Sequence, residues 1–358
     1  MANEEQYELL RGTASDEELE KYRKCFSENG TEKSIELLKW FHQGNLPQLQ
    51  AIYYAIDKNN SQIAAIYTYL PVIMKCMGAT VVAMQSFDTL TDYRHRSKGL
   101  FVRLASTLEK EESLKKNELV YGFPNENSVH GFVKKLKFTY FGEVPFLIKP
   151  LRISYFLRKL FRQKAADTKE EINLNIDVPK KNLLKNNCSI TSITRFGEDY
   201  NLLWGKIASK INIGINRDAA YMNWRYIAKP GENYSIYGFY ETGILNGIVI
   251  FTLKNKHDGR IGYLMEILFD TDNMHAGNAL LSFCSKTLRN NRADLILAWC
   301  FSHSFNYFCH RKAGFYKLPE KIRPQKLGII TKTLNSRRAE DIYNVKNWFF
   351  SYSDSDTV

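Results

Sequence analysis

The chain has 358 residues, of which 44% are hydrophobic and 25% are charged, and its formal net charge is +12. This composition excludes disordered and fibrous proteins, and the length exceeds what one hydrophobic core usually supports, so we expect two domains. The positive charge favours a polyanionic partner, which can be a phosphorylated cofactor, a sugar nucleotide, a nucleic acid or an anionic membrane surface.

The six cysteines are widely spaced, with no Cys-x-x-Cys pair and no Cys/His spacing of a metal site, so we expect reduced thiols and no bound metal. The N-terminal residues are acidic and polar, unlike a secretory signal. The longest apolar stretch, residues 63–84, is interrupted by Pro71, Lys75 and Gly78, which excludes a membrane span. We therefore expect a cytoplasmic protein.

The first half of the chain predicts the order helix, helix, three strands, helix, strand, helix. Residues 15–18 form a capping box that opens the first helix, and residues 58–61 are a turn cluster between two strands. The predicted ranges are 15–25 and 31–41 for the first helices, 50–57, 62–70 and 79–91 for the strands, 100–112 for the third helix, 118–123 for the next strand and 128–136 for the last helix.

Residues 151–187 interrupt this order and are predicted to be a linker. The linker begins with a basic run, residues 151–164, whose apolar spacing predicts an amphipathic helix that either packs between the domains or touches an anionic membrane surface. From residue 188 the same order returns, with strands at 234–240, 244–254, 262–269 and 295–301 and a helix at 276–290. We therefore expect an α/β (α+β) fold with domains at residues 1–150 and 188–358, each a mixed, mostly antiparallel sheet flanked by helices.

Residues 90–104 form the most informative segment, because a strand ends there in a basic loop and a helix starts at about Gly99. The first N–H groups of a helix have no partners within it and can bind a pyrophosphate, and glycine lets a ligand approach the backbone closely. Arg94, Arg96 and Lys98 add positive charge nearby. The alternative is an ordinary turn with solvated basic residues.

This segment resembles the cofactor loop of the GNAT (GCN5-related) superfamily of N-acyltransferases, R/Q-x-x-G-x-G/A after a central strand. Some members carry a longer pattern, T-x-P-x-x-R-x-x-G-[IL]-F with G-F-P-N at the end of the next strand, which residues 91–101 and 122–125 match with Tyr93 in place of proline. The resemblance implies that residues 1–150 are a GNAT-like domain that binds acyl-coenzyme A. Its pyrophosphate would lie on the backbone of Arg96, Ser97, Lys98, Gly99, Leu100 and Phe101.

The resemblance also implies where the rest of the cofactor lies. The pantetheine arm would pair with residues 87–91, and a backbone N–H near Leu90 or Thr91 would polarise the thioester carbonyl. Asn125 and Ser128 would contact the pantetheine or its phosphate, unless they only cap the helix that follows them.

The implied reaction is direct attack of an amine on the thioester, which needs a base for the ammonium proton and an acid for the departing thiolate. Asp88 is the candidate base, directly or through a water, and Tyr121 is an auxiliary candidate, unless both are ordinary strand residues. Family members often carry a tyrosine as the thiol acid, whereas this chain has Phe132 or Val133 at the matching position. Another hydroxyl or a water would replace the tyrosine, or catalysis would be weak.

The second half lacks the cofactor loop, because residues 276–280 have neither the R/Q-x-x-G order nor a basic charge, so we expect a degenerate domain without a coenzyme A site. Residues 221–226 and 348–356 resemble segments of tandem GNAT-like proteins. We expect the tryptophans of these segments, Trp224 and Trp348, in the core; Arg225, Asp354 and Asp356 could instead line an acceptor cleft.

Together these expectations describe a tandem GNAT-like N-acyltransferase that moves an acyl group, acetyl in the first instance, from acyl-CoA to a primary amine of a small polar acceptor. The association of such proteins with surface polysaccharide pathways points to a nucleotide-linked amino sugar. One alternative is an aminoacyl-tRNA-dependent transferase of the Fem type, which would bind RNA but lacks the coenzyme A loop. The other is a non-catalytic acyl-CoA-binding module. We expect no DNA partner.

Overall fold

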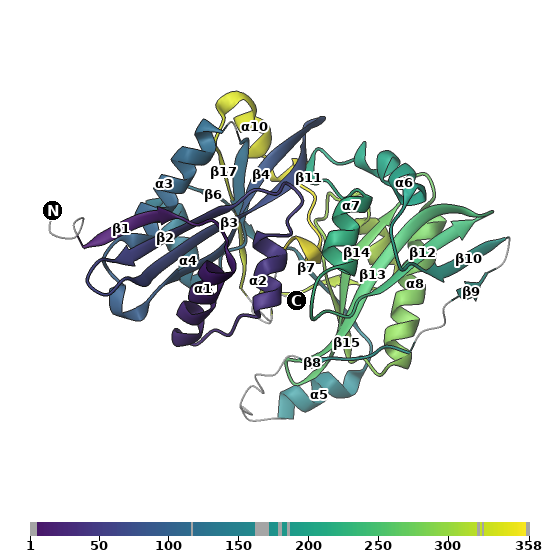
Figure 1. Cartoon of the computed structure of the whole chain (residues 1–358). Coiled ribbons are helices and arrows are strands. Elements are labelled where there is room, and N and C mark those ends of the chain that lie inside the picture. The colour runs from purple at the N-terminus through teal and green to yellow at the C-terminus, as the bar shows by residue number, and fades with distance from the viewer. Residues whose placement is uncertain are drawn as a thin grey trace. The chain divides into compact units, whose positions relative to one another are not determined.

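The computed structural model (Figure 1) describes residues 6–115, 117–161, 172–177, 181–184, 187–320, 323 and 326–355. The chain divides into two compact units, each with its own sheet. The first unit comprises Met1–Glu143, Lys229–Gly231 and Leu327–Asn347, and the second comprises Val144–Ala228, Glu232–Lys326 and Trp348–Val358.

The first unit is a mixed sheet flanked by helices, with the strand order β1-β2-β3-β4-β5-β17-β6. Neighbouring strands are antiparallel except for β4 and β5, which are parallel. The strands are β1 Tyr7–Arg11, β2 Ala51–Asp57, β3 Gln62–Cys76, β4 Ala79–Thr91, β5 Leu119–Gly122, β6 Thr139–Glu143 and β17 Gly328–Thr333. The helices are α1 Asp16–Glu28, α2 Ile35–His42, α3 Leu100–Leu114, α4 Glu126–His130 and α10 Ala339–Ile342, with a 3-10 turn at Tyr93–His95 and a π-helical turn at Gly131–Lys135.

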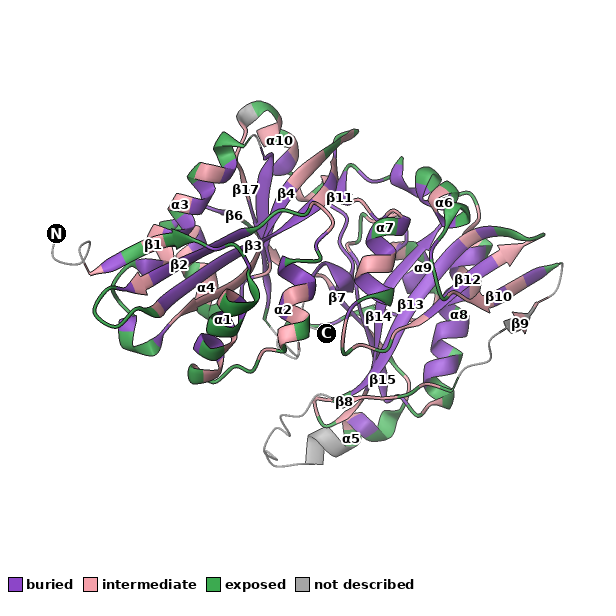
Figure 2. Cartoon of the chain, in the orientation of Figure 1, coloured by how far each residue is buried: buried purple, intermediate pink, exposed green. Residues whose placement is uncertain are grey.

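Helices cover both faces of this sheet, because side chains along a strand alternate between its faces. Helices α1 and α2 pack on the face that carries Ile52 and Tyr54, whereas α3 packs on the face that carries Tyr53 and Ala55. Most residues of β2 and β3 are therefore buried, and the outer sides of the helices are exposed (Figure 2). Only half of the predicted capping box is present at the start of α1: the Ser15 side chain accepts a hydrogen bond from the Glu18 backbone, whereas the Glu18 carboxylate accepts one from the Thr13 backbone N–H.

Strand β1 was not among the predicted elements. It pairs with β2 along all its residues, yet within it only Tyr7 is buried. Such a short segment with little alternation cannot be told from a loop by its sequence. The predicted helix at 128–136 also differs, since the structure divides it into α4 and the π-helical turn that follows.

The second unit repeats this design, with the strand order β16-β7-β15-β14-β13-β12-β10-β9 and β8 beside β13. Its parallel pair is β14 and β15. The strands of this sheet are β7 Phe146–Pro150, β8 Ile172–Asn173, β9 Lys181–Leu183, β10 Cys188–Ser192, β12 Ser235–Glu241, β13 Ile244–Lys256, β14 Gly259–Phe269, β15 Leu295–Trp299 and β16 Tyr316–Lys317. The unit also contains the short strand β11 Ile213–Ile215, which is not part of this sheet. The helices are α5 Ile153–Phe161, α6 Glu198–Ala208, α7 Ala219–Met222, α8 Met274–Asn290 and α9 Tyr307–Lys312.

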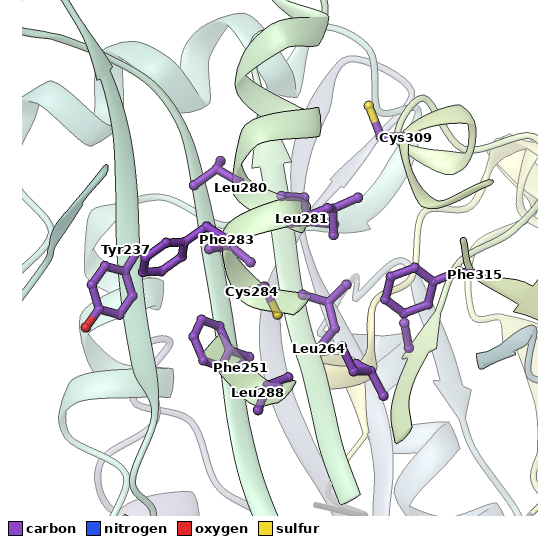
Figure 3. Close-up of a cluster of buried hydrophobic side chains, with 14 of the residues drawn as sticks. Tyr237, Phe251, Leu264, Leu280, Leu281, Phe283, Cys284, Leu288, Cys309 and Phe315 are labelled. Carbon is purple, nitrogen blue, oxygen red and sulfur yellow. The ribbon is translucent and has the colours of Figure 1, made fainter. Parts of the chain in front are cut away.

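The core of the second unit lies between α8 and its sheet (Figure 3). Leu280, Cys284 and Leu288 of α8 lie against strand residues that include Phe251 and Leu264. Their spacing of four residues places them on one face of the helix, which is the pattern that predicted it. All six cysteines of the chain are buried free thiols, as expected.

Strands β7 and β17 show that the compact units differ from the predicted contiguous domains. Strand β7 follows β6 in the chain but lies between β15 and β16 of the second sheet. Strand β17 follows β16 but lies between β5 and β6 of the first sheet. The first domain therefore ends before residue 144 and regains residues 327–347. The sheet that a strand joins depends on distant hydrogen-bond partners, which a local apolar pattern does not reveal.

The predicted linker helix is present as α5. Tyr155 of this helix is buried and donates a hydrogen bond from its hydroxyl to the His257 carbonyl at 2.9 Å. Ile153 and Leu157 are exposed. Tyr155 thus attaches helix α5 to its own unit.

Candidate functional site

The two parallel strands of the first unit separate partway along their length. Strands β4 and β5 pair from Met84 to Ser86, and the last pair is Ser86 with Gly122, where β5 ends. This pair is close, since a Cβ at Gly122 would lie 3.0 Å from the Ser86 Cβ. Strand β4 continues along β3 to Thr91 without β5. An extended ligand can add to an edge of this kind as a further strand.

A β-bulge in β4 lies immediately beyond the last pair. Thr68 of β3 stands opposite two residues of β4, Phe87 and Asp88. The Thr68 hydroxyl accepts a hydrogen bond from the Asp88 backbone N–H at 3.0 Å and donates one to the Asp88 carbonyl at 3.1 Å. Because a bulge bends its strand and increases the twist, it turns β4 away from β5 at this point.

We expect Thr68→Val to lower the free energy of unfolding by about 1–3 kcal/mol, because the shape is kept while the Asp88 backbone loses its partner at the bulge. Urea denaturation of the wild type and the variant measures this difference. Thr80→Val, at an exposed position of the neighbouring strand β4, is the matched control and should be nearly neutral. Equal midpoints for Thr68→Val and Thr80→Val would show that the hydroxyl does not hold the bulge.

Backbone alternation decides which amides of β4 face the open edge. Asp88 is bonded to Thr68 of β3, and the Asp92 N–H donates to the Ala64 carbonyl at 3.0 Å. Alternate residues point their backbone groups to the same side of a strand, so Leu90 also faces β3. Thr91 therefore faces away from β3 and presents its amide to the open edge. Of the two predicted oxyanion donors, the geometry favours Thr91 over Leu90.

The start of α3 lies next to this edge in the chain and carries open backbone amides. Gly99 is the N-cap residue, with φ of 76°, and no side chain caps the helix. In the described part of the chain, the N–H groups of residues 99–102 donate to no protein acceptor. A Cβ at Gly99 would have no atom within 4 Å, so the approach to these amides is free. Open amides at the positive end of a 15-residue helix suit an anion such as a pyrophosphate.

The basic residues of the loop differ in how far they are available to a ligand. Arg94 is paired with the buried Asp92 carboxylate through two hydrogen bonds of 2.9 Å, which hold the pKa of Asp92 well below its usual range. Its charge is therefore largely neutralised, so Arg94 adds less positive charge to the loop than its sequence position suggested. Arg96 and Lys98 are exposed, and neither forms an ion pair within the described residues. Ser97 lies between them in the left-handed region, with φ of 64°.

Leu100 and Phe101 contribute their backbone to the amide cluster and their side chains to the core. Leu100 is 1% exposed. The Phe101 ring packs edge-on against Tyr67 and Phe132, at 5.7 and 5.3 Å between ring centroids. Phe132 is itself buried, so the position where the family often has a tyrosine offers no hydroxyl to the site.

Asn125 and Ser128 lie at the start of α4, where they cap the helix. The Asn125 side-chain oxygen accepts hydrogen bonds from the backbone of Asn127 and Ser128, at 3.1 and 3.2 Å, and from the Ser128 hydroxyl at 3.1 Å. Both residues therefore cap the helix, which was the alternative to contact with a ligand. Asn125 is nevertheless exposed, so contact with a ligand stays a prediction.

Asp88 lies at the bulge and is engaged on both carboxylate oxygens. Oδ2 accepts a hydrogen bond from the Tyr22 hydroxyl at 2.7 Å, and Oδ1 forms an ion pair with Lys33 Nζ at 2.8 Å. Burial, followed by the Asp88 charge, raises the pKa of Tyr22 well above its usual value, so Tyr22 stays a hydrogen-bond donor. The side chains of Lys33 and Asp88 are 17% and 13% exposed. Asp88 is thus a partly accessible carboxylate whose charge is already balanced, which weakens it as a base.

Tyr121, the auxiliary candidate, lies on β5 and is fully buried. Its hydroxyl donates to the Gln85 side chain at 3.3 Å, and its ring packs edge-on against Phe123. The geometry therefore gives Tyr121 a packing role between β4 and β5 in this structure, and a proton-transfer role stays a prediction.

Asp88 forms a cluster with three residues that the sequence did not indicate: Tyr22, Lys33 and His42. They come from α1, the loop before α2 and the end of α2, more than 40 residues before Asp88. Nothing in their local sequence separates them from ordinary helix residues, because their proximity to β4 arises only when the helices cover the sheet.

The second unit contains a counterpart of the bulge. Strands β14 and β15 pair up to Leu264, and β14 then carries one extra residue, Met265, before Glu266. Glu266 thus stands where Asp88 stands in the first unit. Its carboxylate accepts a hydrogen bond from Arg217 Nε at 2.7 Å, and Arg217 Nη2 bonds to Asp354 at 2.6 Å. All three of these side chains are 0% exposed, so no ligand reaches them in this structure.

The residues of the two second-half segments belong largely to this buried cluster. Arg225 is buried and donates hydrogen bonds to the Ser353 carbonyl, at 3.2 and 3.1 Å from Nε and Nη2. Trp348 is 1% exposed, as expected for the core, whereas Trp224 is only partly buried. Asp356 lies outside the described residues. Arg225 and Asp354 thus contact other buried residues of the chain, and a role in an acceptor cleft stays a prediction.

Helix α8, the counterpart of α3, does not present open amides in the same way. The Asn273 side chain accepts a hydrogen bond from the Ala276 backbone at 3.1 Å and so caps the helix. Gly277 packs against Phe269, where a Cβ would lie 2.7 Å from the ring. This helix start is thus closed by its own residues.

Within the described residues, no group of three or more His, Cys, Asp or Glu side chains is placed to hold a metal ion. No helix in that same part of the chain is long and apolar enough to cross a membrane.

Comparison of the chain with known proteins finds similarity in structure only. No model of a protein family matches it, and no curated protein does. Among solved structures, it resembles N-myristoyltransferase of Saccharomyces cerevisiae with bound myristoyl-CoA, with 13% identity over 91% of this chain and 80% of that chain and a TM-score of 0.58.

Two further solved structures are also similar to this chain. One is a probable N-acyltransferase from Enterococcus faecalis V583, with 10% identity over 92% of this chain and 72% of that chain and a TM-score of 0.62. The other is a GCN5-related N-acetyltransferase from Anabaena variabilis, with 12% identity over 94% of this chain and 75% of that chain and a TM-score of 0.63. The predicted GNAT-like fold is therefore confirmed.

Proposed function

We propose that this protein is a GNAT-type N-acyltransferase that moves an acyl group from acyl-CoA to a primary amine. The observation that carries the proposal is the row of open amides at residues 99–102, which follows directly on the unpaired edge of β4. The amides, with Arg96 and Lys98, bind the pyrophosphate, and the pantetheine arm adds to β4 as a strand. The Thr91 amide then polarises the thioester carbonyl.

The donor and the acceptor are proposed at a finer level. Acetyl-CoA is the proposed donor. Because the chain is similar to a structure with bound myristoyl-CoA, a donor with a long acyl chain is tested beside it. The proposed acceptor is a small polar amine, in particular a nucleotide-linked amino sugar used in surface polysaccharide synthesis. The net charge of +12 supports a diphosphate-containing acceptor.

The proposal is tested by incubating the protein with acetyl-CoA or myristoyl-CoA and a panel of amines: a uridine diphosphate-linked amino sugar, glucosamine and ethanolamine. We expect release of free coenzyme A thiol together with an acylated product, seen by mass spectrometry, and the highest kcat/KM for the nucleotide-linked sugar with acetyl-CoA. The same reaction without any amine measures hydrolysis of the thioester and serves as the control.

Two other outcomes would assign a different function. Acyl-CoA binding without turnover of any amine would favour the non-catalytic module. Phe132 supports this alternative, because it stands where the family often has a tyrosine as the thiol acid. No acyl-CoA binding, with salt-dependent affinity for transfer RNA, would favour a transferase of the Fem type.

A further inference from the structure

His42, the last residue of α2, lies beside Asp88 and the bulge of β4. Its ring centroid is 5.7 Å from that of Tyr22 and 6.3 Å from that of Phe87. The residue is only 3% exposed. Among the described residues, its Nε2 has no hydrogen-bond partner. A buried polar atom without a partner costs free energy, so its presence calls for an explanation.

The charges around His42 are those of Asp88 and Lys33. Burial lowers the pKa of His42 to about 4, while Asp88 acts in the opposite direction and Lys33 in the same direction. The imidazole is therefore neutral near pH 7, and a neutral imidazole carries one nitrogen with a free lone pair. His42 is thus a proton acceptor beside a carboxylate whose own oxygens are engaged by Tyr22 and Lys33.

We propose that His42 accepts the proton of the acceptor's ammonium group, and that Asp88 attracts this ammonium in competition with Lys33. This inference rests on the proposed acyl transfer. Asp88 and Lys33 are the partly exposed members of the cluster, so the ammonium arrives through them. Phe87 and Asp88 form the bulge where β4 leaves β5, and this bulge begins the open edge along which a strand-like pantetheine and its thioester would lie.

The proposed step transfers two protons from the acceptor nitrogen. The ammonium gives one proton to His42, and the freed lone pair attacks the thioester carbonyl carbon. Collapse of the tetrahedral intermediate breaks the carbon–sulfur bond, and the second proton of the nitrogen passes to the thiolate to form coenzyme A. His42 then returns its proton to solvent. Burial disfavours a charge on the ammonium as well as on the imidazole. Proton transfer from the ammonium to the imidazole therefore moves one positive charge within the site and does not create a new one.

The test compares the wild type with His42→Gln, which keeps a polar side chain of similar size but cannot take up a proton. Each is assayed with acetyl-CoA and two nucleophiles: ethanolamine, which is protonated at neutral pH, and hydroxylamine, which is largely unprotonated there. We expect His42→Gln to lose at least 100-fold in kcat/KM for ethanolamine and less than fivefold for hydroxylamine. The wild-type profile for ethanolamine should be flat from pH 6 to 8, and that of the variant should rise about tenfold per pH unit as free amine accumulates.

Thermal stabilisation by acetyl-CoA, measured for both proteins, separates the possible failures. Equal losses for both nucleophiles in a variant that still binds acetyl-CoA would show a structural role and overturn the proposal. Unchanged ethanolamine activity would overturn it as well. If the wild type binds acetyl-CoA but acylates neither nucleophile nor any amine of the panel, the proposed function fails and the role of His42 fails with it. The control variant is His130→Gln, at an exposed position. It should leave the activities with ethanolamine and hydroxylamine, and their pH profiles, unchanged.

Discussion

Replacement of Arg217 by methionine is expected to lower the free energy of unfolding by about 3–5 kcal/mol, which is a large fraction of the stability of an ordinary domain. Arg217 holds the carboxylates of Glu266 and Asp354, and all three side chains are 0% exposed. Methionine fills much of the same volume but removes the guanidinium that pairs with both buried carboxylates. Urea or thermal unfolding of both proteins measures the loss.

The pH dependence gives an independent check. Burial raises the pKa of both Glu266 and Asp354, and Arg217 opposes this effect. Without Arg217 the folded-state pKa of both groups rises further above its unfolded value, so the penalty is present at neutral pH and is lost as pH falls through the folded-state pKa. The stability difference between wild type and variant should therefore shrink on acidification.

A matched control for this prediction is Lys206→Met. Lys206 pairs with Asp270 at 2.9 Å, but its side chain is 59% exposed. Removal of such an exposed pair should change the free energy of unfolding by less than about 1 kcal/mol. Similar small losses for Arg217→Met and Lys206→Met would show that the buried cluster does not stabilise the second unit.

Gly99→Glu is expected to abolish the stabilisation of the protein by acetyl-CoA. A ligand at about 100 times its Kd stabilises the folded state by roughly 2.7 kcal/mol, or about 5–10 °C in Tm for a domain of this size. The glutamate carboxylate would occupy the free approach to the amides of residues 99–102 and repel the pyrophosphate. Thermal unfolding of wild type and variant, with and without acetyl-CoA, measures both stabilities.

Gly99→Asn separates the effect of charge from that of backbone strain. Gly99 has φ of 76°, a conformation that asparagine adopts more readily than most residues and glutamate does not. We expect Gly99→Asn to retain most of the shift in Tm with acetyl-CoA. A shift that persists in Gly99→Glu, or a wild type that does not respond at all, would contradict the placement of the pyrophosphate at the start of α3.

The loop that we propose to bind the cofactor could be recognised in the sequence because its features are local. A glycine at the first turn of a helix, two free basic residues and the end of a strand all lie between Thr91 and Phe101. The structure adds that Arg94 is occupied by Asp92, which stands only two residues away. Even here a local pattern could not decide which basic side chain is free, since ion pairing and ligand binding use the same residue types.

The cluster of residues around Asp88 was predictable only in part. Asp88 was found because it lies on the central strand beside the loop. Lys33 and His42 were missed because they reach Asp88 only through the packing of the helical layer on the sheet. The Thr68 hydroxyl was missed for a related reason: a bulge is defined by the register between two strands, and one strand alone does not show it.

The sequence by itself determined the helices and most strands, the repeated order of elements and the open helix start at Gly99, because these depend on the periodicity of neighbouring side chains and on backbone groups close in the chain. The tertiary structure alone decided that β7 and β17 join sheets outside their contiguous halves. It also decided that Glu266 and Arg217 are sealed inside the second unit, while Asp88 and Lys33 stay partly accessible in the first. Burial and hydrogen-bond partners are properties of the packed chain, so identical residue types acquire different roles only when distant segments meet.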